Sequence, residues 1–72
     1  MPRRLPSAVI KDPHVMGGLP VIRGTRIPAH LIWHLVRQGA TLVEILEDYP
    51  ALYPDDVETA LRYAEEHPEE DG

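Results

Sequence analysis

Two arginines flank a Gly-Thr pair in the segment Arg23-Gly24-Thr25-Arg26. The glycine permits a positive φ and therefore a tight reversal of the chain. Because the reversal would bring both arginines near the Thr25 hydroxyl, two guanidinium groups and a hydroxyl could converge on one phosphate or carboxylate. The segment therefore indicates an anion clasp, and the alternative is a hairpin turn with its arginines solvated beside it.

A second cluster of chemically capable side chains falls within one expected helix. A helical wheel places His30, Trp33, His34 and Arg37 opposite the apolar residues of that segment. A tryptophan outside the apolar stripe and beside an arginine is typical of an interface anchor, so we predict that these four residues bind a partner. The alternative is that the N-terminal segment covers Trp33 within one chain. The two histidines have no third ligand nearby, so we predict no metal site.

No arrangement typical of catalysis occurs in the sequence. It has no Ser-His-Asp order, no dinucleotide or phosphate-loop fingerprint, and no pair of carboxylates inside an apolar patch. The carboxylates expected on exposed helix faces are Glu44, Glu47, Asp48, Asp55 and Asp56. We therefore predict that the protein is not an enzyme and has no catalytic residues and no cofactor.

The charge of the chain is divided between its two halves. Residues 1–40 carry six Lys or Arg residues and one acid, a net charge of +5, whereas residues 41–72 carry one Arg and eleven acids, a net charge of −10. This division indicates one half that faces an anionic partner and one that faces a cationic partner, unless the two halves attract each other within a chain or between copies. The cations predicted to contact DNA, if DNA is bound, are Arg3, Arg4, Lys11, Arg23 and Arg26.

The size and composition of the chain limit its class. A chain of 72 residues forms one small domain without room for a large catalytic cleft, and 43% hydrophobic with 26% charged residues is typical of a globular protein. The longest aliphatic or aromatic runs are three residues, so we expect a cytoplasmic protein without a membrane span. Because no cysteine is present to form a disulfide, we expect a homodimer to add buried surface.

The first 27 residues are expected to be extended and rich in turns. A basic arm at 1–6 precedes a short strand at Ser7–Lys11, which an Asp-Pro pair ends because proline cannot donate to a strand ladder. Further extended pieces are predicted at 21–22 and 26–27, on either side of a glycine turn. Since so few strands are not stable alone, we expect them to pair with those of a second copy or to lie across the helices.

Three helices are expected in the rest of the chain, because each has a recognisable start or end. Pro28 suits the first position of a helix, and Gly39 suits the residue just after its end. Thr41 and Glu44 have the spacing of a capping box, which predicts the start of a short second helix. Pro54 opens a third and longer helix.

Apolar side chains recur at helical spacing in each of these segments. In the first they are Leu31, Ile32, Leu35 and Val36. We therefore predict a mainly α fold, in which a three-helix bundle of the helix-turn-helix type at 28–66 follows a short N-terminal β element. An acidic tail is expected at 67–72.

The residues from Asp12 to Pro28, followed by Glu44–Pro50 and by Asp55-Asp56-Val57, resemble the domain-of-unknown-function 433 family. The resemblance covers about residues 8–65, and its most specific part is Gly17-Gly18-x-Pro20-Val21-Ile22-Arg23-Gly24-Thr25-Arg26-Ile27-Pro28. Its members look like VapB-type antitoxins. This resemblance implies a homeodomain-like helical trio, dimerisation, and pairing with a PIN-like nuclease toxin encoded nearby, and it implies no catalytic residue. One departure is Tyr53, where a Thr or Ser helix cap is usual in the family.

The resulting expectation is the antitoxin of a type II toxin-antitoxin pair. Arg23 and Arg26 would pair with the carboxylates of the nuclease site, while the acidic helices would meet a basic RNA-binding rim. Autoregulation through operator DNA is a second expectation, although Asp55, Asp56 and Glu58 at the start of the third helix would repel phosphates. The alternatives are a dimeric DNA-binding regulator without a toxin partner, and an adaptor that binds no nucleic acid.

Overall fold

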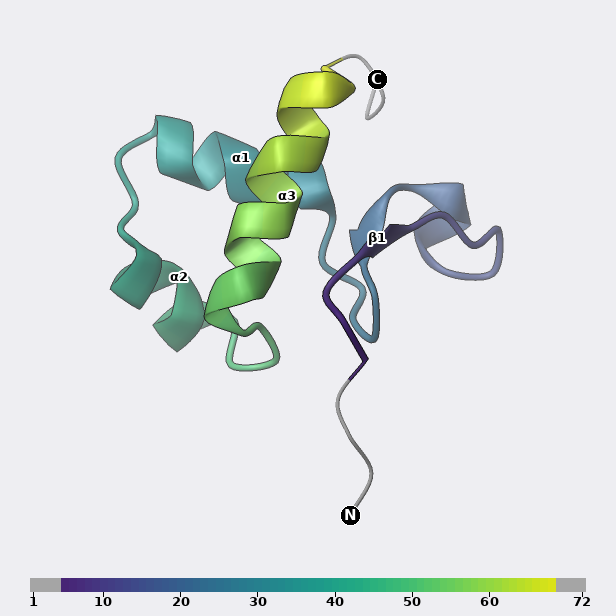
Figure 1. Ribbon diagram of the computed structural model, residues 1–72, viewed down its shortest axis with the longest axis horizontal. Helices are drawn as coiled ribbons and strands as arrows, with labels where there is room; N and C mark the ends of the chain where they lie inside the picture. Colours follow the sequence, from purple (N-terminus) through teal and green to yellow (C-terminus); the bar gives the residue numbers. More distant parts are fainter. Residues whose placement is uncertain (1–4, 69–72) are drawn as a thin grey trace.

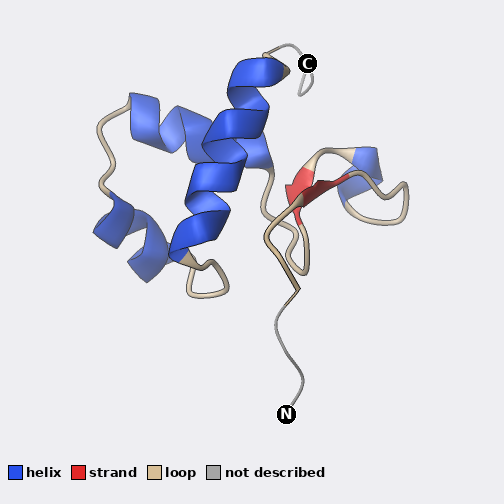
Figure 2. Cartoon of the chain, in the orientation of Figure 1, coloured by secondary structure: helices blue, strands red, loops and turns tan. Residues whose placement is uncertain are grey.

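This computed structural model describes residues 5–68. They form three helices and one two-stranded sheet, joined by turns and loops (Figure 1, Figure 2). The chain order is β1 (Val9–Ile10), a 3-10 turn η1 (Met16–Gly18), β2 (Val21–Ile22), α1 (Ala29–Arg37), α2 (Leu42–Asp48) and α3 (Pro54–Glu66). The predicted mainly α architecture with a short N-terminal β element is therefore confirmed. Every helix within residues 5–68 is too short or too polar to span a lipid bilayer.

The two strands pair with each other within one chain. β1 and β2 are antiparallel, with Val9 opposite Ile22 and Ile10 opposite Val21. An isolated two-stranded sheet is only marginally stable in water, so its stability depends on the contact that β1 makes with α3. Of the two expectations for the extended segments, the structure shows the one in which they lie against helices of the same chain (Figure 1).

Local sequence signals determine where α1 ends and where α2 begins. α1 ends in a Schellman motif, in which the amides of Gly39 and Ala40 donate to carbonyls of the last helical turn at 3.0 Å. The φ of Gly39 is 101°, a value that other residues rarely adopt. α2 begins with the predicted capping box, in which the side chains of Thr41 and Glu44 each accept a hydrogen bond from the backbone amide of the other.

The core lies between the three helices and β2. The buried residues of the core cluster are Ile22, Ala29, Ile32, Ile45, Leu52, Val57 and Ala60. α1 crosses behind α3 in Figure 1, and these two helices share the most extensive contact between elements. Each contributes a fully buried alanine, Ala29 or Ala60, whose small side chain permits close packing.

The buried side of α1 differs from the predicted apolar stripe. Of the four predicted apolar positions only Ile32 is fully buried, whereas Ala29 and His30, which the stripe does not include, are buried. The first turn of α1 packs beneath the C-terminal half of α3, as the ring contact between His30 and Tyr63 shows. A helical wheel shows only which residues of one helix share a face. It cannot predict that a neighbouring helix, here α3, buries Ala29 and His30.

Candidate functional site

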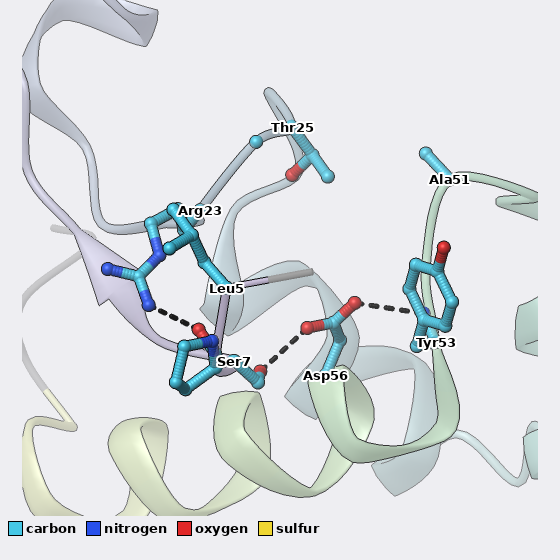
Figure 3. Close-up of a pocket in the computed structure, with 9 residues that line it drawn as sticks. Leu5, Ser7, Arg23, Thr25, Ala51, Tyr53 and Asp56 are labelled. Atoms are coloured by element: carbon cyan, nitrogen blue, oxygen red, sulfur yellow. Dashed lines mark hydrogen bonds between the residues drawn. The ribbon is translucent and has the colours of Figure 1, made fainter. Parts of the chain in front are cut away.

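A pocket of about 260 Å³ lies where residues 5–7, the turn at 23–25 and the start of α3 meet (Figure 3). Its walls bring together residues that are far apart in the sequence, and they are Leu5, Pro6, Ser7, Arg23, Gly24, Thr25, Ala51, Tyr53 and Asp56. The pocket is open to solvent, since Leu5 and Tyr53 are 64% and 53% exposed. One surface location therefore combines a guanidinium, a hydroxyl and a carboxylate.

Asp56 is almost completely buried at this pocket, with 2% of its surface exposed. Its Oδ1 accepts a hydrogen bond from the Ser7 hydroxyl at 2.6 Å, and its Oδ2 accepts one from the Tyr53 amide at 2.9 Å (Figure 3). The prediction of an exposed Asp56 is therefore wrong. The carboxylate closes the first turn of α3, where Tyr53 supplies no capping hydroxyl, and holds Ser7 against the helix.

Arg23 is half-buried in another wall of the pocket. Its Nη2 donates a hydrogen bond to the carbonyl oxygen of Pro6, whereas its Nε is buried and has no hydrogen-bond partner among residues 5–68. The guanidinium is thus held by a backbone carbonyl of the chain itself.

The predicted anion clasp is not assembled in one place. Thr25 uses its hydroxyl inside the turn, where it donates to the carbonyl of Ile22 at 2.8 Å and accepts from the amide of Ile27 at 3.0 Å. Arg26 is exposed and does not line the pocket that Arg23 lines. The alternative of a hairpin turn therefore fits Thr25 and Arg26, but not the half-buried Arg23.

Gly24 has a φ of 84° in this turn, and nothing lies within 4 Å of the position that an added Cβ would occupy. Gly24→Val should lower the free energy of unfolding by about 1–2 kcal/mol, because a β-branched residue is strained in the left-handed region even where space is free. Thermal unfolding followed by circular dichroism measures this loss. Gly24→Asn is the control, since asparagine tolerates a positive φ, and a valine variant as stable as the native chain would contradict the prediction.

His30 is buried rather than exposed, with 3% of its surface accessible. Its ring contacts Tyr63 edge-on at a centroid distance of 6.1 Å, and its Nε2 lies 2.7 Å from the carbonyl oxygen of His67. Because a carbonyl only accepts, Nε2 carries a proton and donates it, whereas the buried Nδ1 has no partner among residues 5–68. The prediction that His30 lies on an exposed partner-binding face is therefore wrong, since its side chain joins the start of α1 to the end of α3.

Trp33, His34 and Arg37 form the accessible part of the predicted α1 cluster. The Arg37 guanidinium lies 5.0 Å from the centroid of the Trp33 ring, and the His34 ring contacts the same indole edge-on at 5.1 Å. Trp33 is half-buried, whereas His34 and Arg37 are exposed. The structure thus brings three of the four predicted residues together on one surface of α1.

The other predicted cations are distributed around the β1–β2 region. Lys11 and Arg26 are exposed, whereas Arg3 and Arg4 lie outside the described residues. Of the five cations predicted to contact DNA, two therefore face solvent in the described part of the chain, and Arg23 is bonded to Pro6. Within residues 5–68, no group of three His, Cys, Asp or Glu side chains is placed to hold a metal ion.

Ser7 and Tyr53 belong to the pocket, although the sequence did not single them out as site residues. Ser7 lies 49 positions before its partner Asp56, so no local pattern connects the two. A signal exists for Tyr53, because Asp56 stands three residues later, at the spacing at which a side-chain carboxylate reaches back to the amide before a helix. That spacing could have identified Asp56 as a cap.

Comparison with known proteins identifies relatives of the chain. The family model described as "Protein of unknown function (DUF433)" matches residues 9–64. The uncharacterized protein y4eO from Sinorhizobium fredii (strain NBRC 101917 / NGR234) is 37% identical over 60 residues, which cover 83% of this chain and 27% of that protein. A crystal structure of a DUF433 member protein from Anabaena variabilis ATCC 29413 matches with a TM-score of 0.77 and 39% identity, over 85% of this chain and 60% of that chain. The chain thus spans less than a third of the curated relative's length.

Proposed function

Because this chain belongs to the DUF433 family, whose description assigns no function, we propose one from its surface chemistry, namely that it is the antitoxin of a type II toxin-antitoxin pair. It binds a PIN-like nuclease toxin encoded nearby and blocks access to the carboxylates of the nuclease site. It acts by binding and not by catalysis. The resemblance of the family to VapB-type antitoxins supports this proposal, and the charged surfaces of the chain support it independently.

The proposal rests on the separation of exposed charges between the elements. The exposed acids of α2 and α3 are Glu44, Glu47, Asp48, Asp55, Glu58, Glu65 and Glu66. A nuclease that cleaves RNA must hold phosphates with cations, so its RNA-binding surface complements these carboxylates. On these two helices the only cation is Arg62, which pairs with Glu58 at 3.1 Å, so the surface stays strongly acidic.

The same charges argue against α3 as a DNA recognition helix. Its first two turns carry the exposed residues Asp55 and Glu58, which would face phosphates in the major groove and weaken binding. The β1–β2 region favours a second candidate function, because Lys11 and Arg26 are exposed there. DNA binding through this region would serve autoregulation, or transcriptional control without a toxin.

Co-expression with the PIN-like nuclease of the neighbouring reading frame tests the proposal. RNA cleavage by the purified nuclease is measured with and without the chain. We expect a stoichiometric complex and loss of cleavage, with weaker binding at high salt because exposed charges are then screened. A nuclease that stays active beside an excess of folded chain would exclude the antitoxin function. Salt-sensitive retention on duplex DNA would in that case support the regulator.

Trp33→Ala should weaken binding of the nuclease about 30-fold, on the order of 2 kcal/mol. The physical reason is that the exposed part of this half-buried indole, with the Arg37 guanidinium over its ring, provides a rigid contact surface with a cationic edge. Isothermal titration calorimetry measures the affinity, and sedimentation measures whether the predicted homodimer depends on the same residue. Gln38→Ala, at an exposed position just after α1, is the control. Unchanged affinity and sedimentation would show that Trp33 packs only within its own chain.

A further inference from the structure

An apolar groove of about 360 Å³ lies between α3 and the connection from α1 to α2. In Figure 1 this connection lies on the side of α3 away from the strands. Its walls are Val36, Ala40, Leu42, Pro54, Val57, Glu58 and Leu61, of which only Glu58 is polar. Leu42 is 46% exposed at its edge, and the adjacent Val43 is 63% exposed. Exposed apolar side chains beside an apolar groove make it a candidate interaction site.

One acidic side chain, Glu58, lines this groove. The two helices that contribute to its walls also carry other exposed acids, among them Glu47 on α2 and Glu65 on α3, one helical turn after Leu61. Glu58 is paired with Arg62, but these side chains are 77% and 62% exposed. Since solvent screens such a pair, it contributes little stability, and an incoming cation can replace Arg62. The groove therefore combines an apolar floor with an acidic edge.

We propose that this groove binds an amphipathic helix of a partner protein whose apolar side chains are flanked by lysine or arginine. The inference deepens the proposed function, on which it rests, because it names the surface of the antitoxin and the kind of nuclease element that meet. From Pro54 to Leu61 the groove follows α3 for about 10 Å at 1.5 Å per residue. That length matches two turns of a bound helix with anchors at i, i+4 and i+7. The acidic edge disfavours nucleic acid as the occupant.

A second copy of the chain fits the groove less well. Each helix directs its main buried residues into its own core, and these include Ile32 of α1, Ile45 of α2 and Ala60 of α3. The accessible Trp33 and Arg37 of α1 could enter the groove of another copy, but such a contact joins two different surfaces and extends into filaments unless its rotation closes a ring. A helix from a different protein is free of this constraint.

Two synthetic helical peptides test shape and charge together on the full chain. One carries leucines at i, i+4 and i+7 with lysines between them, and the other carries glutamates in place of the lysines. Fluorescence anisotropy should show at least tenfold tighter binding of the lysine peptide. Leu42→Gln and Glu58→Lys should each weaken that binding at least fivefold. The control variants Leu5→Gln and Glu66→Lys, at exposed positions outside the groove, should change it less than twofold.

Three outcomes would overturn the groove proposal. They are equal binding of the two peptides, equal effects of groove and control variants, and a sedimenting dimer that Leu42→Gln disrupts, which would identify a second copy as the occupant. Circular dichroism melting establishes that each variant is folded. Nuclease inhibition separates this proposal from the antitoxin function. Inhibition that survives both groove variants rejects the groove alone, whereas a native chain that never inhibits rejects the antitoxin and leaves the groove to be judged by the peptides.

Discussion

Replacing Ile32 with alanine should lower the free energy of unfolding by about 3 kcal/mol. The side chain is fully buried in the core cluster, which joins α1 to β2, α2 and α3. Alanine leaves a cavity that packed helices close only partly, so the lost contacts are not regained. The whole stability of a 72-residue chain is roughly 4–11 kcal/mol. The melting temperature should therefore fall by roughly 12–24 °C.

Two milder variants serve as controls for Ile32→Ala. Ile32→Val should cost about 1 kcal/mol, and Val43→Ala, at a position that is 63% exposed, should cost less than about 0.5 kcal/mol. A saturating binding partner should restore part of the lost melting temperature by mass action. A loss below about 1 kcal/mol for Ile32→Ala would mean that the helices pack more loosely around this residue than the structure shows.

Replacing Asp56 with alanine should lower the free energy of unfolding by about 2–3 kcal/mol. The variant loses both bonds of the buried carboxylate, one to the Ser7 hydroxyl and one to the Tyr53 amide, and leaves these donors without their acceptor. Urea unfolding measures the loss of stability. Limited proteolysis should also cut near Ser7 faster than in the native chain, because the hydroxyl no longer holds this segment to α3.

Asp56→Asn removes the negative charge but keeps a hydrogen-bond partner for both Ser7 and Tyr53. The amide oxygen can still accept from the Tyr53 amide, and its NH₂ group can donate to the Ser7 hydroxyl, which is able to accept. We therefore expect a loss between that of Asp56→Ala and zero. Asp55→Ala is the control, since Asp55 is exposed in the same helical turn, and it should cost less than about 1 kcal/mol. Equal losses of stability in Asp55→Ala and Asp56→Ala would contradict the prediction, because they would show that the buried bonds of Asp56 do not stabilise the fold.

The ends of the helices could be predicted from the sequence because their signals are local. Gly39 after α1, the capping box of Thr41 and Glu44, and Pro54 at the start of α3 all act within one helical turn. The partner of β1 could not be predicted in this way. A strand of two residues is too short for its sequence to indicate a register. The two-stranded sheet depends for its stability on the contact of β1 with α3, which the sequence does not reveal.

The sequence predicts the types of residue at the candidate site, but not which of them are buried or which come together. The excess of acids on the second half of the chain follows from composition, and the structure adds that Asp56 is buried among them. His30 was misplaced because the wheel of a single helix contains no information on Tyr63 and His67, which cover it from α3 and the residue after it. Contacts between distant segments decide which polar side chains remain accessible, and no spacing rule along the chain reports them.

The bond between Ser7 and Asp56 has a consequence for how the chain is made on the ribosome. Ser7 is synthesised 49 residues before its partner, so the two strands leave the ribosome long before α3 is complete. Until then Val21 and Ile22, both fully covered in the finished fold, stay open to chaperones and proteases. Chains that end before α3 would therefore leave both side chains uncovered and be open to degradation.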